Sequence, residues 1–133
     1  MRRILLVEDS AATRSFVRSA LEADAAEIGP VEIVEAEGGF DGLRLLPRGP
    51  WDLVITDINM PDINGLELVR FMRAHRQHCN TPVLLISTQT SDRDRQRGLA
   101  IGANGYLAKP FTPERLREEA ARQLSRIGSD PHD

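Results

Sequence analysis

Acidic, hydroxyl and ammonium side chains stand where short apolar runs of this sequence end. Glu8 and Asp9 follow one run, Asp57 follows another, and Ser87 and Lys109 follow two more. Short apolar runs without polar alternation are typical of strands that are buried on both faces of a parallel sheet. Because the carboxyl ends of parallel strands share one edge of the sheet, these five side chains are expected to converge in one cleft.

Three carboxylates in one cleft repel one another, by roughly 4 kcal/mol for a pair 4 Å apart at an effective dielectric near 20. Either one pKa rises or a cation lies between them. Magnesium suits such a site because it prefers oxygen ligands and keeps waters that a phosphoryl oxygen can replace. Lys109 adds a second positive charge and Ser87 a hydroxyl donor. The set is suited to in-line phosphoryl transfer with Asp57 as the nucleophile.

Each of these residues, taken singly, has a simpler explanation. Asp57 can cap a turn, and Glu8 with Asp9 can be an acid pair at the positive end of a helix. Lys109 alone would be a solvated lysine, and Tyr106 a half-buried strand aromatic. Only their expected convergence favours a chemical site over these alternatives.

The elements that must position these residues alternate between strand and helix. Ser10 is expected to cap the first helix, and Thr112 with Pro113 the last. Residues 92–101 predict a largely solvated helix, rich in Arg and Asp. The expected strands are 4–7, 33–36 (near the sheet edge), 51–57, 82–87 and 106–109, and a short helix is expected at 39–46. One-face helical spacing is shown by Phe16, Val17, Ala20 and Leu21, by Leu66, Val69 and Met72, and by Leu116, Ala120, Leu124 and Ile127. Five βα units predict an α/β fold with a parallel sheet covered on both faces.

Composition limits the function classes. The chain of 133 residues fits one domain, and its net charge of −3 gives no reason to expect nucleic acid or an anionic membrane as partner. Lys109 is the single lysine beside sixteen arginines, and either a need for a compact ammonium at this position or the base composition of the gene explains this imbalance. The lone Cys79 forms no internal disulfide, and no leader or long apolar run is seen. These features predict a cytoplasmic protein.

Several motifs stand in a fixed order at these strand ends. They are VEDS at 7–10, DINMP at 57–61 with Gly65, Ser87, Gly105 with Tyr106, and KPF at 109–111. With them the chain resembles the receiver domain of two-component response regulators, and the single-domain chemotaxis (CheY-like) type in particular. The resemblance implies a flavodoxin-like doubly wound (βα)5 fold with strand order 2-1-3-4-5. It also implies a receiver domain over residues 1–127, followed by a short tail at 128–133.

The resemblance assigns chemical roles within the expected site. Asp57 would accept the phosphoryl group, and Lys109 would pair first with Asp57 and then with the phosphoryl oxygens. Mg²⁺, with Mn²⁺ as a substitute, would be held by Glu8, Asp9 and Asp57 and by the backbone carbonyl of Asn59. The transfer would be self-catalysed, with hydrolysis of the aspartyl phosphate and no turnover of a separate substrate.

The resemblance also implies a switch. Ser87 would move towards the phosphate and Tyr106 would swing inward, which would alter the face made by the fourth helix, fifth strand and fifth helix. The Lys109–Pro110 bond is expected to be cis. Thr88 departs from the small residue usual in the family and would narrow access to the site. Asn59 and Gln89 occupy positions that tune hydrolysis, and neither is a carboxylate here.

The implied partners are proteins. A sensor histidine kinase or a phosphotransfer protein would donate the phosphoryl group, and a downstream target would bind the switched face, in chemotaxis or motility if the likeness extends that far. A monomer or weak dimer is expected. A phosphorylation-independent pseudo-receiver is one rival. A haloacid dehalogenase-type phosphatase is another, although in that family the nucleophile lies in an Asp-x-Asp pair on the first strand, whereas Glu8 and Asp9 here precede Asp57 and Asn59 follows it.

Overall fold

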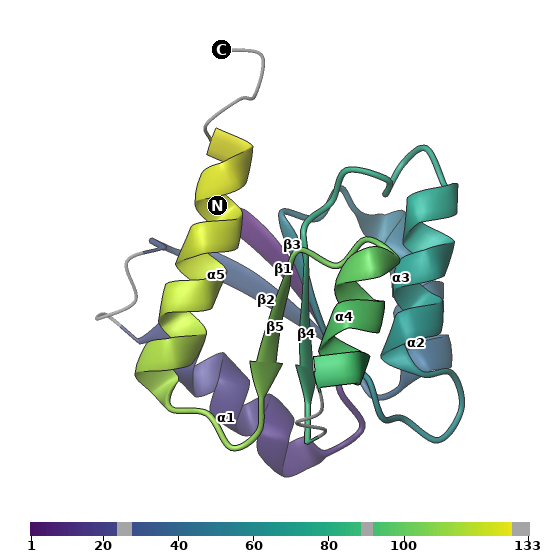
Figure 1. Cartoon of the computed structure of the whole chain (residues 1–133). Coiled ribbons are helices and arrows are strands. Elements are labelled where there is room, and N and C mark those ends of the chain that lie inside the picture. Colours follow the sequence, from purple (N-terminus) through teal and green to yellow (C-terminus); the bar gives the residue numbers. More distant parts are fainter. Residues whose placement is uncertain (24–27, 89–91, 129–133) are drawn as a thin grey trace.

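A computed structural model describes residues 1–23, 28–88 and 92–128 of the chain (Figure 1). Strands and helices alternate along these residues, as the sequence predicts. The elements are β1 (Arg2–Val7), α1 (Ala11–Glu22), β2 (Val31–Ala36), α2 (Gly39–Leu45), the short 3-10 helix η1 (Leu46–Arg48), β3 (Leu53–Asp57), α3 (Gly65–Ala74), β4 (Val83–Ser87), α4 (Asp92–Ala100), β5 (Gly105–Ala108) and α5 (Pro113–Gly128).

The five strands form one parallel sheet in the order β2-β1-β3-β4-β5, which confirms the predicted topology. Helices α1 and α5 cover one face of the sheet, and α2, α3 and α4 cover the other (Figure 1). Successive side chains of a strand point to opposite faces. Thus Ile4 and Leu6 of β1 pack in the α1–α5 core, whereas Leu5 and Val7 pack in the core under α2 and α3. The architecture is the flavodoxin-like α/β fold.

Side-chain caps fix where the helices begin. Ser10 Oγ accepts a hydrogen bond from the backbone N–H of Thr13 (3.3 Å), and Thr112 Oγ1 accepts one from Arg115 N (3.1 Å), so both predicted caps are confirmed. Asn64 begins α3 with a capping box, in which its side chain accepts from Glu67 N while the Glu67 carboxylate accepts from Asn64 N. These hydrogen bonds satisfy N–H groups that have no partner within the helix.

The structure corrects several predicted details. β3 begins at Leu53 and not at Trp51, because pairing with β1 starts at Ile4 and Leu53, and Arg3 N donates to the Asp52 carboxylate (2.8 Å). The Trp51 indole N–H donates to the carbonyl of Leu46 (3.0 Å), and its ring lies 4.4 Å from the Arg3 guanidinium. Phe16, predicted on the buried face of α1, is 40% exposed and makes an edge contact with Phe111. The boundaries of the other strands shift by one or two residues. β2 lies at the sheet edge, as predicted.

Helix α4 is largely solvated, as its composition predicts. Gly98 is its one buried residue, and a Cβ atom there would lie 2.5 Å from Leu85 Cδ1 of β4. The helix therefore approaches the sheet through a position without a side chain. No helix in the described part of the chain is long and apolar enough to span a membrane.

Candidate phosphoacceptor site

The register of the sheet brings the predicted site residues together. Val7 pairs with Thr56, so the next residues, Glu8 and Asp57, stand side by side where β1 and β3 end. Ser87 ends β4, and its carbonyl accepts a hydrogen bond from the backbone N–H of Lys109 (2.7 Å). All four side chains thus lie at the carboxyl edge of the sheet, which is the usual place for ligand sites in open α/β folds.

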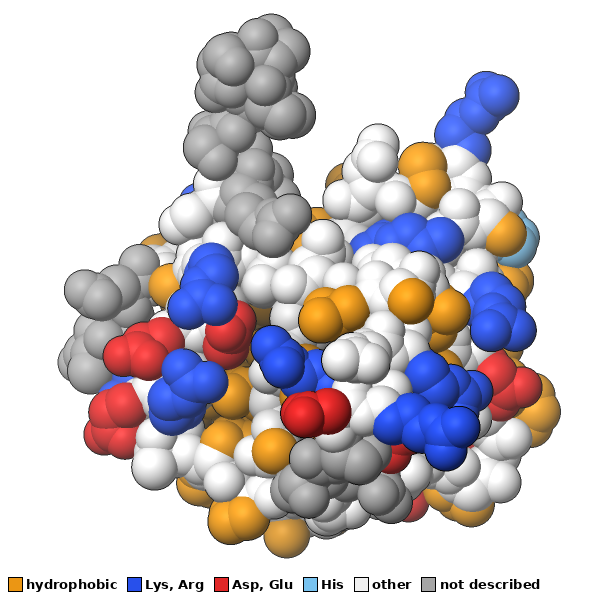
Figure 2. All heavy atoms as spheres, viewed as in Figure 1, with side chains coloured by type: hydrophobic (Ala, Val, Ile, Leu, Met, Phe, Trp, Pro, Cys, Tyr) orange, Lys and Arg blue, Asp and Glu red, His pale blue; other side chains and the backbone are white. Residues whose placement is uncertain are grey.

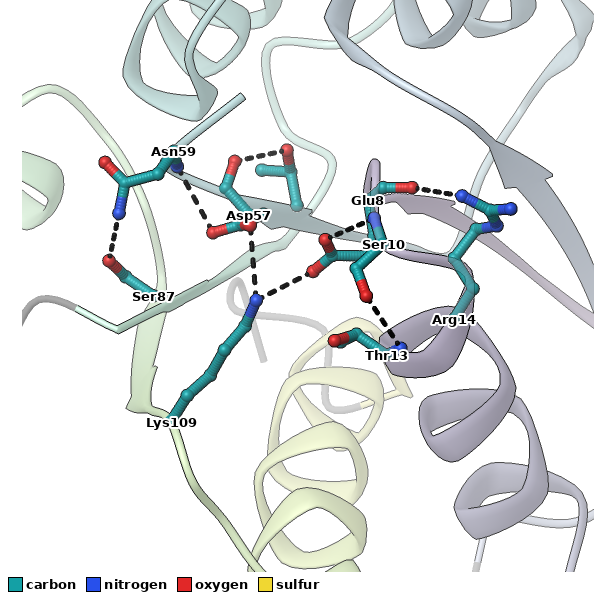
Figure 3. A network of polar contacts seen from close by, with 9 residues as sticks. Glu8, Ser10, Thr13, Arg14, Asp57, Asn59, Ser87 and Lys109 are labelled. Atoms are coloured by element: carbon teal, nitrogen blue, oxygen red, sulfur yellow. Dashed lines mark hydrogen bonds and ion pairs between the residues drawn. The ribbon is translucent and has the colours of Figure 1, made fainter. Parts of the chain in front are cut away.

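The Lys109 ammonium bridges two buried carboxylates (Figure 3). Its Nζ lies 3.0 Å from Glu8 Oε1 and 3.2 Å from Asp57 Oδ2. The Glu8 side chain is fully buried and Asp57 is only 4% exposed. Burial alone would lower the pKa of Lys109, but the hydrogen bond to Glu8 and the charges of Asp57 and Glu8 raise it overall. The ammonium therefore stays charged and holds Asp57 in place.

Ser10, the N-cap residue of α1, and Arg14 within α1 both donate hydrogen bonds to Glu8. Its Oε2 accepts from Ser10 N (2.9 Å), and its carbonyl oxygen accepts from Arg14 Nη1 (2.7 Å). Burial raises the pKa of Glu8, the Asp57 charge raises it further, and the hydrogen bonds from Ser10 and Lys109 oppose that rise. Glu8 is thus a carboxylate whose ionised form depends on nearby positive charge.

The third carboxylate, Asp9, is exposed at the rim of the site. Carboxylate oxygens of Glu8, Asp9 and Asp57 lie within 4.8 Å of one another. Together with the single Lys109 ammonium, three carboxylates leave a charge of −2, which a divalent cation would neutralise. The cluster therefore fits a metal ion that prefers oxygen ligands.

Asn59 links the acceptor to the hydroxyl residue. Its backbone N–H donates to Asp57 Oδ1 (3.2 Å), and its side-chain Nδ2 donates to Ser87 Oγ (3.1 Å). Figure 3 shows the Asn59 amide turned towards Ser87, whose side chain is buried at the end of β4. The sequence predicts roles for the Asn59 carbonyl and for its effect on water, but not this link between Asp57 and Ser87.

The loop after Asp57 is fixed at both ends. A Cβ atom at Gly65 would lie 2.3 Å from the Asp57 carbonyl oxygen, so the loop closes back on β3 only because residue 65 is glycine. Asp62 accepts hydrogen bonds from Gly39 N (3.0 Å), Phe40 N (2.9 Å) and Ile63 N (2.7 Å). The donors at Phe40, Ile63 and Gly39 lower the pKa of the Asp62 carboxyl. Asp62 thereby caps α2 from a distant loop.

The remaining predicted residues lie near the site at different depths. Tyr106 is half-buried in the hollow between α4 and α5, with Arg95 and Leu99 on its α4 side. Thr88 is exposed directly after Ser87, and the Lys109–Pro110 peptide bond is cis. Gln89 lies outside the described residues.

Sequence reasoning missed three features of the site: the Arg14 contact to the Glu8 carbonyl, the cap by Asp62, and an apolar hollow beside Lys109. The hollow has a volume of about 290 Å³ and is lined by Ala12, Thr13, Phe16, Lys109, Pro110 and Phe111. The adjacent Gly38 and Gly39, which offer no side-chain cap for α2, were the one sequence signal for the Asp62 contact. The hollow is formed by residues about a hundred positions apart, and the Arg14 contact depends on the direction of its side chain.

Comparison with known proteins agrees with this geometry. The family model of the response regulator receiver domain matches residues 4–121. The chain belongs to this receiver family. Membership favours the receiver interpretation over the phosphatase alternative, and the acidic cluster, Asp57 and Lys109 occupy the strand ends at which the resemblance placed the receiver site.

The relatives differ in the share of their own length that aligns with this chain. A chemotaxis protein CheY homologue of Campylobacter jejuni is 34% identical over 118 residues, covering 88% of this chain and 88% of that protein. A probable transcriptional regulatory protein of Picosynechococcus is 42% identical over 127 residues, covering 90% of this chain, which spans about half (47%) of that protein. The structure of CheY4 of Vibrio cholerae superposes with a TM-score of 0.83 at 36% identity, covering 92% of this chain and 98% of that one.

Proposed function

We propose that this receiver accepts a phosphoryl group from a sensor histidine kinase or a phosphotransfer protein onto Asp57, and that phosphorylation controls the binding of a protein partner to the α4–β5–α5 face. The observation that carries the proposal is the Asp57 carboxylate, 4% exposed at the end of β3, in contact with Lys109 and beside two further carboxylates. A turn-capping aspartate would need neither the Lys109 ammonium nor the buried Glu8.

Glu8, Asp9 and Asp57 would hold Mg²⁺, with the Asn59 carbonyl as a further oxygen ligand, and Mn²⁺ can take the same ligands. When bound, the ion supplies positive charge for the attacking carboxylate and the transferred phosphoryl oxygens. Lys109, whose Nζ lies 3.2 Å from Asp57 Oδ2, supplies a second positive charge. Together the two cations offset the three negative charges of Glu8, Asp9 and Asp57, so the incoming anionic phosphoryl group meets no net negative charge.

In the transfer step an Asp57 carboxylate oxygen forms a bond to phosphorus as the bond from phosphorus to the donor histidine nitrogen breaks. The histidine takes up a proton as it leaves, and the product is an acyl phosphate on Asp57. The partly exposed Lys109, 18% accessible at its side chain, can follow the charge from the carboxylate to the phosphoryl oxygens. Water later attacks the acyl phosphate, which ends the signal.

Ser87 and Tyr106 would carry the change to the surface. Ser87 Oγ is held by Asn59 in this structure, so its movement towards a phosphoryl oxygen requires that hydrogen bond to break. Tyr106, half-buried in the hollow between α4 and α5, would then move inward. A small change at the site would thus alter the α4–β5–α5 face.

The CheY likeness supports a role in chemotaxis or motility, with a downstream protein as the target. The curated relatives include both a chemotaxis protein and a transcriptional regulatory protein. We therefore place the specificity of the output in the surface residues of the α4–β5–α5 face and not in the site.

Incubation with Mg²⁺ and acetyl phosphate, followed by intact mass spectrometry, tests the proposal. We expect one phosphoryl group per chain, stable in acid and labile in base, that is lost in Asp57→Ala and when Mg²⁺ is chelated. Thr56→Ser is the matched control. It changes the residue next to Asp57 but keeps Glu8, Asp9 and Asp57, so this variant should still be phosphorylated.

The outcomes separate the three candidate functions. A stoichiometric adduct on Asp57 supports the receiver, continuous release of phosphate by turnover supports a phosphatase, and an unmodified protein supports a pseudo-receiver. Modification that persists in Asp57→Ala would contradict the assignment of the acceptor.

A further inference from the structure

Among the residues that the structure describes, the arginines of α1 and α5 form ion pairs with acidic side chains, whereas most arginines of α3 and α4 do not. On α1 and α5, Arg14, Arg18, Arg115 and Arg122 each form an ion pair with a glutamate. In Figure 2 blue and red side chains accordingly lie next to one another over α5. Their charges are largely satisfied within the chain.

The arginines of α3 and α4 behave differently. Arg70 of α3 and Arg93, Arg95 and Arg97 of α4 are exposed, and none forms an ion pair with any residue in the described ranges. Figure 2 shows a group of blue side chains over α4 and beside α3. The two helices also carry Glu67, Asp92 and Asp94, but the arginines outnumber these carboxylates, so an anionic partner would be attracted to this surface.

Two of these arginines flank a small groove between α3 and α4. The groove has a volume of about 120 Å³ and is lined by Leu66, Arg70, Arg97, Ala100 and Ile101. Its floor is apolar, since Leu66 is 9% exposed and Ile101 packs against the core under α3. The site therefore offers a guanidinium on each side of a shallow apolar hollow.

We propose that this α3–α4 groove is a docking site for an acidic segment of a partner protein, with an aliphatic side chain in the hollow and carboxylates on Arg70 and Arg97. Guanidinium groups match carboxylates in planar, paired hydrogen bonds. A protein segment fits better than nucleic acid, because the chain carries a net charge of −3 and the groove is short and apolar at its floor. The groove lies on the side of α4 that faces α3, whereas the α4–β5–α5 face lies on the side that faces β5 (Figure 1). Binding in the groove does not depend on Asp57.

The α4–α5 hollow is the natural comparison within the same molecule. It is lined by Arg95, Arg115 and Arg122, but Arg115 pairs with Glu118 (3.6 Å) and Arg122 with Glu119 (2.8 Å). An acidic segment that binds there must displace those glutamates. The α3–α4 groove needs no such displacement, which is why it is the stronger candidate for an acidic partner.

A suitable probe is a short, fluorescein-labelled peptide in which glutamate alternates with leucine. The control is the same peptide with glutamine in place of each glutamate. Binding is measured by fluorescence anisotropy on the unphosphorylated full chain. We expect the acidic peptide to bind more tightly than the control, and raising the salt from about 0.05 M to about 0.5 M to weaken binding as the charges are screened.

Charge reversal locates the site. Arg70→Glu with Arg97→Glu should raise Kd at least about fivefold, whereas Arg48→Glu with Arg76→Glu, which makes the same change of charge at exposed arginines outside the groove, should change Kd by less than about twofold. Circular dichroism checks that both pairs fold. Amide shifts in NMR spectra should move at residues 66–70 and 97–101 when the peptide is added.

Other outcomes would overturn the proposal. These are equal loss of binding in both charge-reversed pairs, shifts centred on Arg115 and Arg122 of α5, or tighter binding of a single-stranded oligonucleotide than of the acidic peptide. Asp57→Ala should bind the peptide as the unaltered chain does, so failure here is distinct from failure of phosphorylation.

Discussion

Helices α4 and α5 flank the same strand, β5, yet the fold holds them in different ways. α5 buries Leu116, Ala120 and Leu124 almost completely in the α1–α5 core. α4 buries only Gly98, and its other residues are charged, small or exposed. An element held by few apolar contacts opens or shifts at lower free-energy cost than one anchored in a core. We therefore expect α4, and not α5, to be the helix that shifts if Ser87 moves on phosphorylation of Asp57.

The largest expected effect comes from the anchored helix. Leu124→Ala removes a side chain that is 1% exposed, and it should lower the free energy of unfolding by about 2–5 kcal/mol. Leu99→Ala removes the 41% exposed leucine of α4 and should change it by less than about 0.5 kcal/mol. Urea denaturation of both variants measures the difference. Equal losses would mean that α4 is anchored as firmly as α5.

The close approach of α4 to the sheet gives the next effect. Gly98→Ala places a Cβ atom against Leu85, and overpacking of this kind costs about 1–3 kcal/mol, partly offset by the gain in helix propensity of about 1 kcal/mol. We expect a net loss of stability, with Gln96→Ala on the exposed side as the control. A more stable Gly98→Ala protein would show that α4 can move away from β4 without cost.

The ion pairs beside α1 give a smaller, pH-dependent effect. The hydrogen bond and charge of Arg18, together with those of Arg14, lower the pKa of Glu35. A lowered pKa in the folded state stabilises the fold above the ordinary pKa of the group, and that contribution is lost as the pH falls below about 4.5. Glu35 is 29% exposed at its side chain, so the contribution should be about 1 kcal/mol or less.

Glu35→Gln should therefore lower stability at neutral pH and reduce the further loss on acidification, as followed by the urea midpoint between neutral and acidic pH. Glu32→Gln, whose carboxylate is 51% exposed at the side chain, is the control and should change the profile less. An acid-induced loss in Glu35→Gln as large as in the unaltered chain would contradict this role.

Much of this comparison was accessible from the sequence. The short apolar runs predicted the sheet, the family resemblance that the motifs carry implied its strand order, and the Arg and Asp content of residues 92–101 predicted a solvated α4. The caps at Ser10 and Thr112 were predictable because their signals are local. Local patterns thus predicted which residues stand at the strand ends.

Contacts between residues distant in the sequence were not predictable. The Asp62 cap on α2, the Asn59 amide on Ser87 and the edge contact of Phe16 with Phe111 each depend on where a loop or side chain turns after the fold has formed. Arg73 is a further case, since its guanidinium donates to the carbonyls of Gly102, His78 and Cys79 and so joins α3 to the loop after α4. No spacing rule predicts such partners.

Amide hydrogen exchange before and after addition of Mg²⁺ and acetyl phosphate tests the central claim most directly. Phosphorylation of Asp57 should change exchange in α4 and β5, around Tyr106, and leave the buried face of α5 nearly unchanged. Ser87→Ala should still take up the phosphoryl group but lose most of that change, and Asp57→Ala should show neither. A chain that is phosphorylated on Asp57 without any change in α4 and β5, or one that changes equally in Asp57→Ala, would contradict the account.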